Sequence, residues 1–137
     1  MKRIFLDANI IIDLIEGRQL EDSGANKLKK EFSNAVIYIS SLSVHIVFHI
    51  LRIKAKSKTH KKVLEFFDFV DILPLTSQTI LHASKTRYSD FEDTLQYLMA
   101  LNADCNYILT RDKKDFEKIK KVIPSKIKIV TNISQIK

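Results

Sequence analysis

The stretch Asp90–Phe116 reads DFEDTLQYLMALNADCNYILTRDKKDF, an acidic start followed by an apolar helix, a short strand and a second acidic turn. Apolar side chains recur at helical spacing from Phe91, which predicts a helix with one buried face that ends near Ala103. Asp90 stands just before this helix, where a short side-chain oxygen caps the first backbone N–H groups. The segment Asn106–Thr110 is β-rich and too short for a helix, so we expect a buried strand there.

Acidic residues mark both ends of this unit. Asp93 falls in the first turn of the predicted helix, Asp112 follows the predicted strand, and Asp115 lies one helical step further. Each position alone has a structural explanation, because helix N-termini favour negative charge and turns favour Asp. Two acidic clusters at the same end of neighbouring elements also form a pattern that a metal site can use.

The composition describes a globular chain of 137 residues, long enough for one domain with a real core and too short for two. The chain is 45% hydrophobic and 28% charged, which excludes a disordered protein. Its single cysteine, Cys105, excludes an internal disulfide, and no Cys–His spacing suggests zinc. Without a signal peptide or a long apolar span, we expect a cytoplasmic protein with no membrane partner.

The formal charge is +7, from 23 basic and 16 acidic residues. This balance favours a polyanion such as RNA or DNA as partner, and the alternative is a lysine-rich surface that only aids solubility. The densest basic cluster occupies residues 54–62. Lys113 and Lys114 adjoin Asp112, so we expect these two lysines to contact RNA.

Short apolar strands alternate with helices along the chain. We expect the remaining strands at 3–7, 36–40, 72–75 and 126–130. We expect helices at 20–32, from about 63 to 70 and at 77–86, and another that ends near residue 55 with Ser41 or Ser43 as its cap. A further helix follows the first strand, with Asn9 as its cap and Gly17 as its end. Pro74 limits ladder pairing and places its strand at an edge. The alternation predicts an α/β fold with a mostly parallel sheet covered on both faces.

In such sheets ligands gather beyond the carboxyl ends of the strands, where the strand order reverses. Asp7 and Asp112 both follow strands, and the helix that Asp93 opens can point its N-terminus at the same crevice. Three converging carboxylates repel one another, and a hard divalent cation relieves that repulsion. Oxygen-only ligands fit Mg²⁺ or Mn²⁺, which can orient water for attack on a phosphodiester. Asp13 lies inside an apolar helix, and we expect it to face solvent.

Three stretches resemble the PIN domain, in particular small bacterial proteins related to VapC-type toxins. They are LDANIIIDLI at 6–15, SSLSVHIVFHILR at 40–52 and the unit at 90–116. The resemblance spans nearly the whole chain and implies one PIN-like domain over residues 1–137. It implies a three-layer α/β/α fold with a five-stranded parallel sheet, and metal-dependent cleavage of single-stranded RNA. The partners it implies are RNA, an antitoxin protein and a second copy of the chain in a homodimer.

Carried over position by position, the resemblance makes Asp7, Asp93 and Asp112 the catalytic, metal-binding acids. Asn9 and Thr110 match polar positions that support the site. Asp90 and Asp115 are candidates for an outer shell of the same site.

One departure from the family pattern concerns the helix after the second strand. Many PIN domains carry an acid early in this helix, whereas this chain reads Ser43, Val44, His45, Ile46. His45 and Asp13 are the candidates for a partial substitute. An imidazole is a poor Mg²⁺ ligand, however, so we expect His45 to pack or hydrogen-bond. The missing acid predicts a weakened ribonuclease, and the alternative is a PIN-like module that binds RNA or a protein without efficient cleavage. A third interpretation is an α/β scaffold whose acids only cap helices; metal binding separates these cases.

Overall fold

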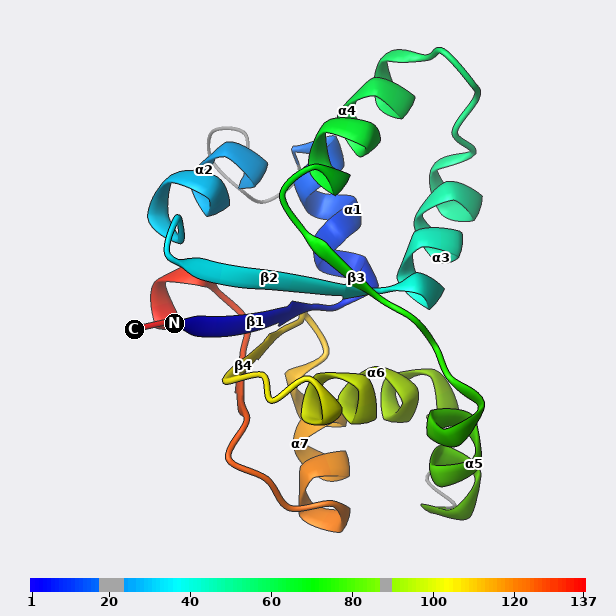
Figure 1. Ribbon diagram of the computed structural model, residues 1–137, viewed down its shortest axis with the longest axis vertical. Helices are drawn as coiled ribbons and strands as arrows, with labels where there is room; N and C mark the ends of the chain where they lie inside the picture. The colour runs from blue at the N-terminus through cyan, green and yellow to red at the C-terminus, as the bar shows by residue number, and fades with distance from the viewer. Residues whose placement is uncertain (18–23, 87–89) are drawn as a thin grey trace.

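A computed structural model describes residues 1–17, 24–86 and 90–137, and it places one sheet between two layers of helices (Figure 1). The strands are β1 (Lys2–Leu6), β2 (Ala35–Ser40), β3 (Asp71–Leu73), β4 (Tyr107–Leu109) and β5 (Lys128–Val130). All four pairings are parallel, in the order β3-β2-β1-β4-β5. The expected five-stranded parallel α/β fold is therefore confirmed, including the edge position of β3.

Alternation along the strands divides the core in two. Ile4 and Leu6 pack into one apolar cluster, whereas Phe5 points to the opposite face and packs into the other. Helices α1 (Ala8–Glu16), α2 (Gly24–Glu31), α3 (Ser41–Leu51) and α4 (Lys58–Phe67) cover the first face. Helices α6 (Phe91–Asn102) and α7 (Lys113–Val122) cover the second, and α5 (Ser77–Thr86) packs against α6. A short 3₁₀ turn, η1 (Ile133–Gln135), follows β5.

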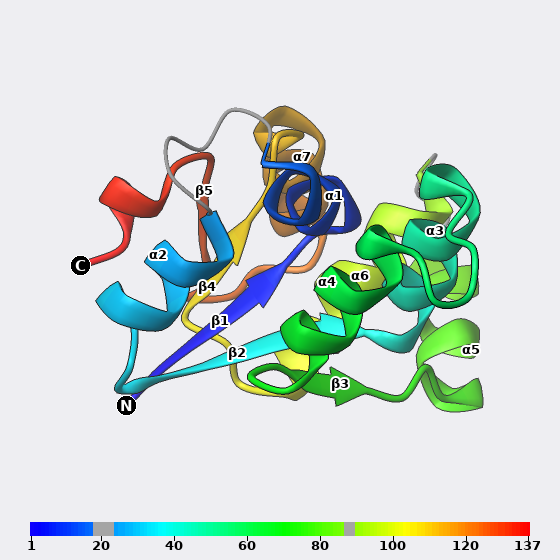
Figure 2. The same ribbon diagram turned by 90° about the horizontal axis from the view of Figure 1, so that it is seen from above.

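The strand order changes direction between β1 and β4. The chain moves outward from β1 through β2 to the edge strand β3, then crosses back to form β4 on the other side of β1. Figure 2 shows the strands running side by side in one direction, with the N-terminus at their starting end. The reversal between β1 and β4 is the position where α/β sheets bind ligands.

Side-chain caps fix where the helices begin, and two of the expected caps are wrong. Asp7 caps α1 by accepting from the backbone N–H of Ala8, so Asn9 lies within the helix and does not cap it. Ser40, not Ser41 or Ser43, caps α3, because its hydroxyl oxygen accepts from the Ser43 backbone N–H. Both expectations placed the cap after the true boundary, because the strand passes into the helix without a loop.

Helix ends also differ from the expectation. α3 ends at Leu51, where Arg52 adopts the left-handed conformation with φ 48°, so the helix stops short of residue 55. The expected helix at 20–32 begins at Gly24 as described, and its first residues lie outside the described ranges. Gly17 ends α1 as predicted, with φ 71°, a conformation that favours glycine.

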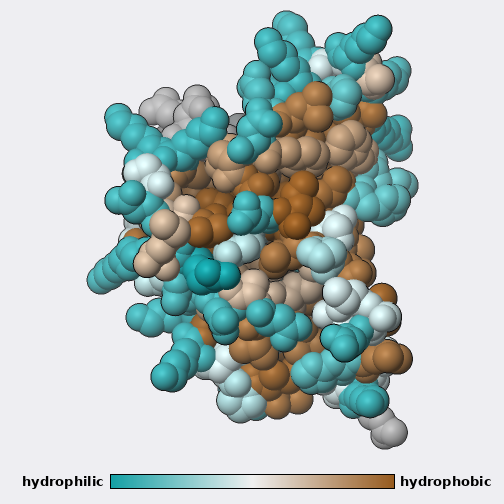
Figure 3. All heavy atoms as spheres, in the orientation of Figure 1, coloured by the Kyte–Doolittle hydropathy of each residue, from teal (hydrophilic) through white to brown (hydrophobic). Residues whose placement is uncertain are grey.

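The face in Figure 3 is the side of the edge strand β3, where brown apolar side chains gather near β3 and α4 within a teal, hydrophilic surround. Ile72 of β3 and Leu64 of α4 are both exposed. Pro74 follows β3 directly, which shortens the edge available for pairing with another strand. Over the described residues, the structure contains no helix with the length and hydropathy needed to cross a membrane.

Candidate metal centre

Three carboxylates lie together beyond the carboxyl ends of β1 and β4. Asp7, Asp93 and Asp112 each offer an oxygen atom that lies within 4.8 Å of the others. They come from the end of β1, the first turn of α6 and the start of α7, three elements that the sheet topology brings to one place. The structure therefore brings together the three acids that the sequence singled out.

Asp7 is held rigidly. One carboxylate oxygen accepts from the Ala8 backbone N–H at 2.7 Å, and the other accepts from the Thr110 hydroxyl at 2.7 Å. The side chain is only 2% exposed, and this burial raises its pKa above the usual range, assisted by the negative charge of Asp112. Hydrogen bonds from Thr110 and Ala8, and the nearby Gln96 side chain, lower the pKa and so oppose that rise.

The pKa of Asp93 is raised as well. Burial is the largest cause, the negative charges of Asp7, Asp90 and Asp112 add to it, and together they raise the pKa to about 8. Its backbone N–H donates to the Asp90 carboxylate at 3.0 Å, which fixes the first turn of α6. The acids of the site therefore resist full ionisation together, and a bound cation would favour their ionised forms.

Thr110 hydrogen-bonds to both Asp7 and Asp112. Its hydroxyl donates to Asp7 and accepts from the Asp112 backbone N–H at 2.9 Å, so it sets the spacing between the two acids. Asp112 occupies the first position before α7 without capping it through its side chain. Instead it accepts a long hydrogen bond, 3.4 Å, from the Asn9 side-chain amide. Asn9 and Thr110 thus both contact the acids that they were expected to support.

Asp90 and Asp115 lie beside the trio. Together with Asp93 they form a second group whose carboxylate oxygens lie within 4.8 Å of one another. Asp93 therefore belongs to both groups. Asp90 also caps α6, which gives it a structural role independent of any cation.

Sequence reasoning missed Gln96, a fully buried residue of α6. Its carbonyl oxygen accepts from the Ser43 hydroxyl of α3 at 3.4 Å, and its amide lowers the pKa of Asp7. Gln96 follows Asp93 by three residues, so it lies on the same face of the helix. The signal available in the sequence was a polar side chain one turn after the acid, within an otherwise apolar helix.

Asp13 does not face solvent as expected. It is 2% exposed, and one of its carboxylate oxygens lies 3.4 Å from Nε of Arg111. Arg111 stands between Thr110 and Asp112, so this ion pair ties α1 to the backbone segment that carries two site residues. The pairing partner is 98 residues away in the chain (111 − 13), which local reasoning about one helix cannot detect.

α3 presents no acid toward the three carboxylates. Ile46 lies one turn after Ser43, whose hydroxyl contacts Gln96, and it is half-buried without joining an apolar cluster. His45 and His49 are exposed and stack on each other with ring centroids 6.3 Å apart. His45 thus packs, as expected, on the neighbouring histidine of its own helix.

Lys113 and Lys114 open α7 directly after Asp112, and both are exposed. Both therefore follow a site acid directly in the chain and are accessible to solvent.

The donor set fits a hard divalent cation. All three groups are carboxylates, and the pKa values of the two buried ones, Asp7 and Asp93, are raised first by burial and further by the negative charges of neighbouring acids. A cation held between the three oxygens would compensate this charge and favour the ionised forms of all three acids. No nitrogen or sulfur ligand belongs to the group, which distinguishes it from a structural zinc site.

The family profile of the PIN domain matches residues 4–122. The chain belongs to the PIN domain family. The matched segment begins within β1, contains β2, β3 and β4, and reaches the end of α7. It includes the three carboxylates of the site.

Two known PIN-type proteins illustrate the relationship. Ribonuclease VapC1 of Aquifex aeolicus (strain VF5) is 25% identical over 119 residues, which cover 82% of this chain and 83% of that protein. A crystal structure of VapBC2 from Rickettsia felis, bound to a DNA fragment from their promoter, aligns with a TM-score of 0.70 at 19% identity. That alignment covers 93% of this chain and 98% of the other, so the PIN fold extends over nearly the full length.

Proposed function

We propose that this PIN protein is a metal-dependent endoribonuclease that cleaves single-stranded RNA and is the toxin of a toxin–antitoxin pair. The observation that carries the proposal is the convergence of Asp7, Asp93 and Asp112, with carboxylate oxygens within 4.8 Å of one another. The similarity to Ribonuclease VapC1 supports RNA cleavage as the activity. The structural similarity to a VapBC complex supports an antitoxin protein as a partner.

The three acids would hold one or two Mg²⁺ or Mn²⁺ ions. When bound, such an ion supplies positive charge that activates a water molecule and stabilises the phosphodiester during in-line attack. The chain's own residues then have separate tasks. Thr110 and the Ala8 backbone N–H hold the Asp7 carboxylate in place, and Asn9 orients Asp112. Lys113 and Lys114 contact RNA phosphates beside the scissile bond as exposed point charges.

The proposal also covers the domain span, the outer acids, the protein partners and the location of the protein. One PIN-like domain spans residues 1–137, with Asp90 and Asp115 as an outer shell around Asp93. A second copy of the chain and an antitoxin are its protein partners. A reducing cytoplasm suits a chain whose single cysteine, Cys105, is buried and free.

A binding module with weak or no cleavage is the second candidate. The observation that favours it is Ile46, which stands on α3 where many PIN domains carry an acid. With one carboxylate fewer, the site holds a cation less tightly, and a second cation is the first to be lost. On either account RNA binding persists, whereas only the nuclease needs all three acids.

The deciding experiment measures cleavage of a fluorescent single-stranded RNA while Mn²⁺ is titrated into metal-free protein, beside Asp93→Asn and Asp112→Asn. For a nuclease we expect cleavage that rises with Mn²⁺, stops with chelator and is lost in both variants. Calorimetry on the same proteins should show weaker Mn²⁺ binding in the variants.

Equal Mn²⁺ affinity in the wild type and both variants would overturn the site. Tight RNA binding without cleavage at any Mn²⁺ concentration would instead favour the binding module.

A further inference from the structure

A second concave surface lies at the opposite end of the sheet from the acids. It is an open hollow of about 980 Å³ at the amino ends of the strands. Its lining comes from Lys2 of β1, residues 31–35 before and at the start of β2, residues 105–107 at β4, and Ile133, Ser134, Ile136 and Lys137. The carboxylate trio contributes nothing to this lining, so the hollow is separate from the candidate metal centre.

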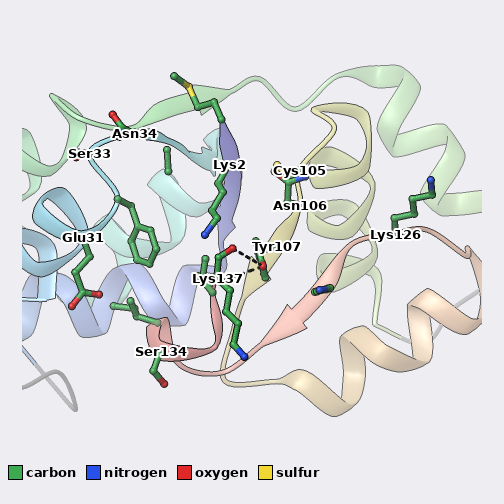
Figure 4. Close-up of a pocket in the computed structure, with 16 residues that line it drawn as sticks. Lys2, Glu31, Ser33, Asn34, Cys105, Asn106, Tyr107, Lys126, Ser134 and Lys137 are labelled. Atoms are coloured by element: carbon green, nitrogen blue, oxygen red, sulfur yellow. Dashed lines mark hydrogen bonds between the residues drawn. The ribbon is translucent and has the colours of Figure 1, made fainter.

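The described lining of the hollow is positively charged. Four of its residues are lysines and one is an acid, Glu31; the lysines are Lys2, Lys126, Lys128 and Lys137. Figure 4 shows Lys2 reaching in from β1, while Lys126 lies at the rim on the segment that arrives from α7. A concave surface with this excess of lysine suits a polyanion.

The neutral groups of the hollow also suit a nucleic acid strand. Ser33, Asn34 and Asn106 are exposed hydrogen-bonding residues in its lining. Phe32 is partly exposed and offers an aromatic ring on which a base can stack. Tyr107 is not available for this role, because its ring is buried and its hydroxyl hydrogen-bonds the backbone of Lys137 (Figure 4).

A row of lysines connects the two ends of the molecule. α7 begins at the metal centre, and the chain after it leads to β5 at the hollow. Lys114, Lys118 and Lys121 are exposed and follow the spacing i, i+4, i+7, which places them on one face of α7. The opposite face, with Phe116 and Ile119, is buried in the core.

The segment that connects the two ends is strongly positive. Residues 113–128 contain seven lysines and two acids, a net charge of +5 (7 − 2). Lys120 is used internally, since its amine donates to the Ile127 carbonyl at 2.7 Å. The exposed lysines on α7, together with Lys126 and Lys128, therefore form a path from the acids to the hollow.

We propose that this path and the hollow bind the backbone of single-stranded RNA beyond the cleavage site. The inference rests on the proposed ribonuclease function, since it extends the same substrate along the protein surface. Lysine contacts to phosphate carry no base information, so binding here lengthens the footprint without adding sequence specificity. The RNA that the protein holds is therefore longer than the few nucleotides that fit at the carboxylates.

The length of the sheet sets how much RNA the path requires. β1 has five residues, so its two ends lie roughly 13 Å apart at about 3.3 Å per residue. A stacked strand advances about 3.4 Å per nucleotide, so at least roughly four nucleotides separate the two sites. An RNA of about four nucleotides reaches only one site, whereas one of about 12 reaches both.

The test compares RNA affinity for these two lengths by fluorescence anisotropy in the Asp93→Asn background, so that cleavage does not disturb binding. The double variant Lys126→Gln/Lys128→Gln removes two exposed lysines of the hollow. The control, Lys58→Gln/Lys62→Gln, removes the same charge from exposed positions of α4. Because cleavage is not the readout, the result is independent of whether the wild type proves to be a nuclease.

We expect the hollow variant to weaken binding of the long RNA several-fold and to leave the short RNA unchanged. The salt dependence for the long RNA should become shallower by about 1.4, from two phosphate contacts at about 0.7 each. Two results would overturn the inference: equal losses in the hollow and α4 variants, or a hollow variant that binds the long RNA like its parent. The first would assign the effect to overall charge.

Discussion

The two ends of the sheet carry opposite charge in opposite settings. At the carboxyl end, Asp7 and Asp93 are buried and their pKa values are raised. At the amino end, Lys126 and Lys128 are exposed around an open hollow. Buried like charges are costly and need a compensating ion, whereas exposed charges remain solvated and can exchange partners. The carboxyl end is therefore suited to holding a metal tightly, and the amino end to holding a flexible polyanion loosely.

The sheet itself produces this division. In a parallel sheet every strand ends at the same edge, so residues that follow β1 and β4 meet without any specific contact between the strands. The N-terminus of α6 points at this edge and favours negative charge there. The amino ends receive the chain from the turn after α2 and the segment after α7, and the helix start in the lining of the hollow is that of the short 3₁₀ turn η1.

Replacing Asp7 by Asn should produce the largest effect and separate chemistry from stability. The Asn oxygen can still accept from the Ala8 N–H, and the Thr110 hydroxyl can turn to accept from the new amide. We expect cleavage to fall by more than about 100-fold, because losing even an outer-shell group costs about 10- to 100-fold. The melting temperature of the metal-free protein should stay level or rise, because a buried charge is removed.

Activity assays and thermal melts on the same preparation check both outcomes. The comparison variant, Lys126→Gln/Lys128→Gln, changes the hollow at the amino ends of the strands. That variant should keep its turnover number on short RNA. Residual cleavage near the wild-type rate in Asp7→Asn would remove Asp7 from the site.

Restoring the missing acid should strengthen the carboxyl end. Ile46→Glu places a carboxylate one turn after Ser43, on the face of α3 that reaches Gln96. We expect Mn²⁺ to bind about tenfold more tightly, since affinity follows the number of charged ligands. The control Ile50→Glu adds the same charge one turn further on, at a position 54% exposed, and should change nothing.

Melts of both variants with and without Mn²⁺ distinguish the outcomes. Metal stabilisation beyond that of the wild type in Ile46→Glu alone supports a site that lacks its fourth acid. A fall in melting temperature that Mn²⁺ does not reverse would place Ile46 in the core instead.

The pKa of Asp93 predicts how stability changes with pH. An unfolded Asp titrates near 3.8, whereas folded Asp93 titrates at about 8, so between these values the folded state holds a proton that the unfolded chain has released. The stability that this carboxyl contributes is present below about pH 3.8 and is lost as the pH rises through about 8. Metal-free wild type should therefore lose stability over this window relative to Asp93→Asn.

Thermal melts of both proteins across this window, without metal, measure the difference. Parallel curves would contradict the raised pKa. Saturating Mn²⁺ should stabilise the wild type most at the alkaline end, because it binds the ionised carboxylates.

Much of this arrangement was predictable from the sequence, because it depends on local patterns. Strand–helix alternation predicted the parallel sheet, and Pro74 predicted the edge strand. The acids that follow strands were expected at one edge, and the structure brings Asp7 and Asp112 together with Asp93. The roles of these acids in metal binding stay predictions.

The features that escaped prediction depend on contacts between distant segments. The Asp13–Arg111 pair joins two parts of the chain that no periodicity relates, so Asp13 was expected to face solvent. Gln96 was read as part of an apolar helix, although it hydrogen-bonds Ser43 of α3. The hollow gathers five separate segments, and its lysines are unremarkable within any one of them.

The smallest expected effect concerns Asp90, whose two roles can be separated by two substitutions. Asp90 accepts from the Asp93 N–H as a cap, and its charge raises the pKa of Asp93. Asn caps a helix as well as Asp does, so Asp90→Asn should change stability by a few tenths of a kcal/mol, whereas Asp90→Ala should cost ~1 kcal/mol. If Asp90 acts only through the cap and its charge, Asp90→Asn lowers the pKa of Asp93 and leaves Mn²⁺ affinity level or slightly tighter. Weaker Mn²⁺ binding in Asp90→Asn, measured by calorimetry, would instead make Asp90 a ligand with Asp115.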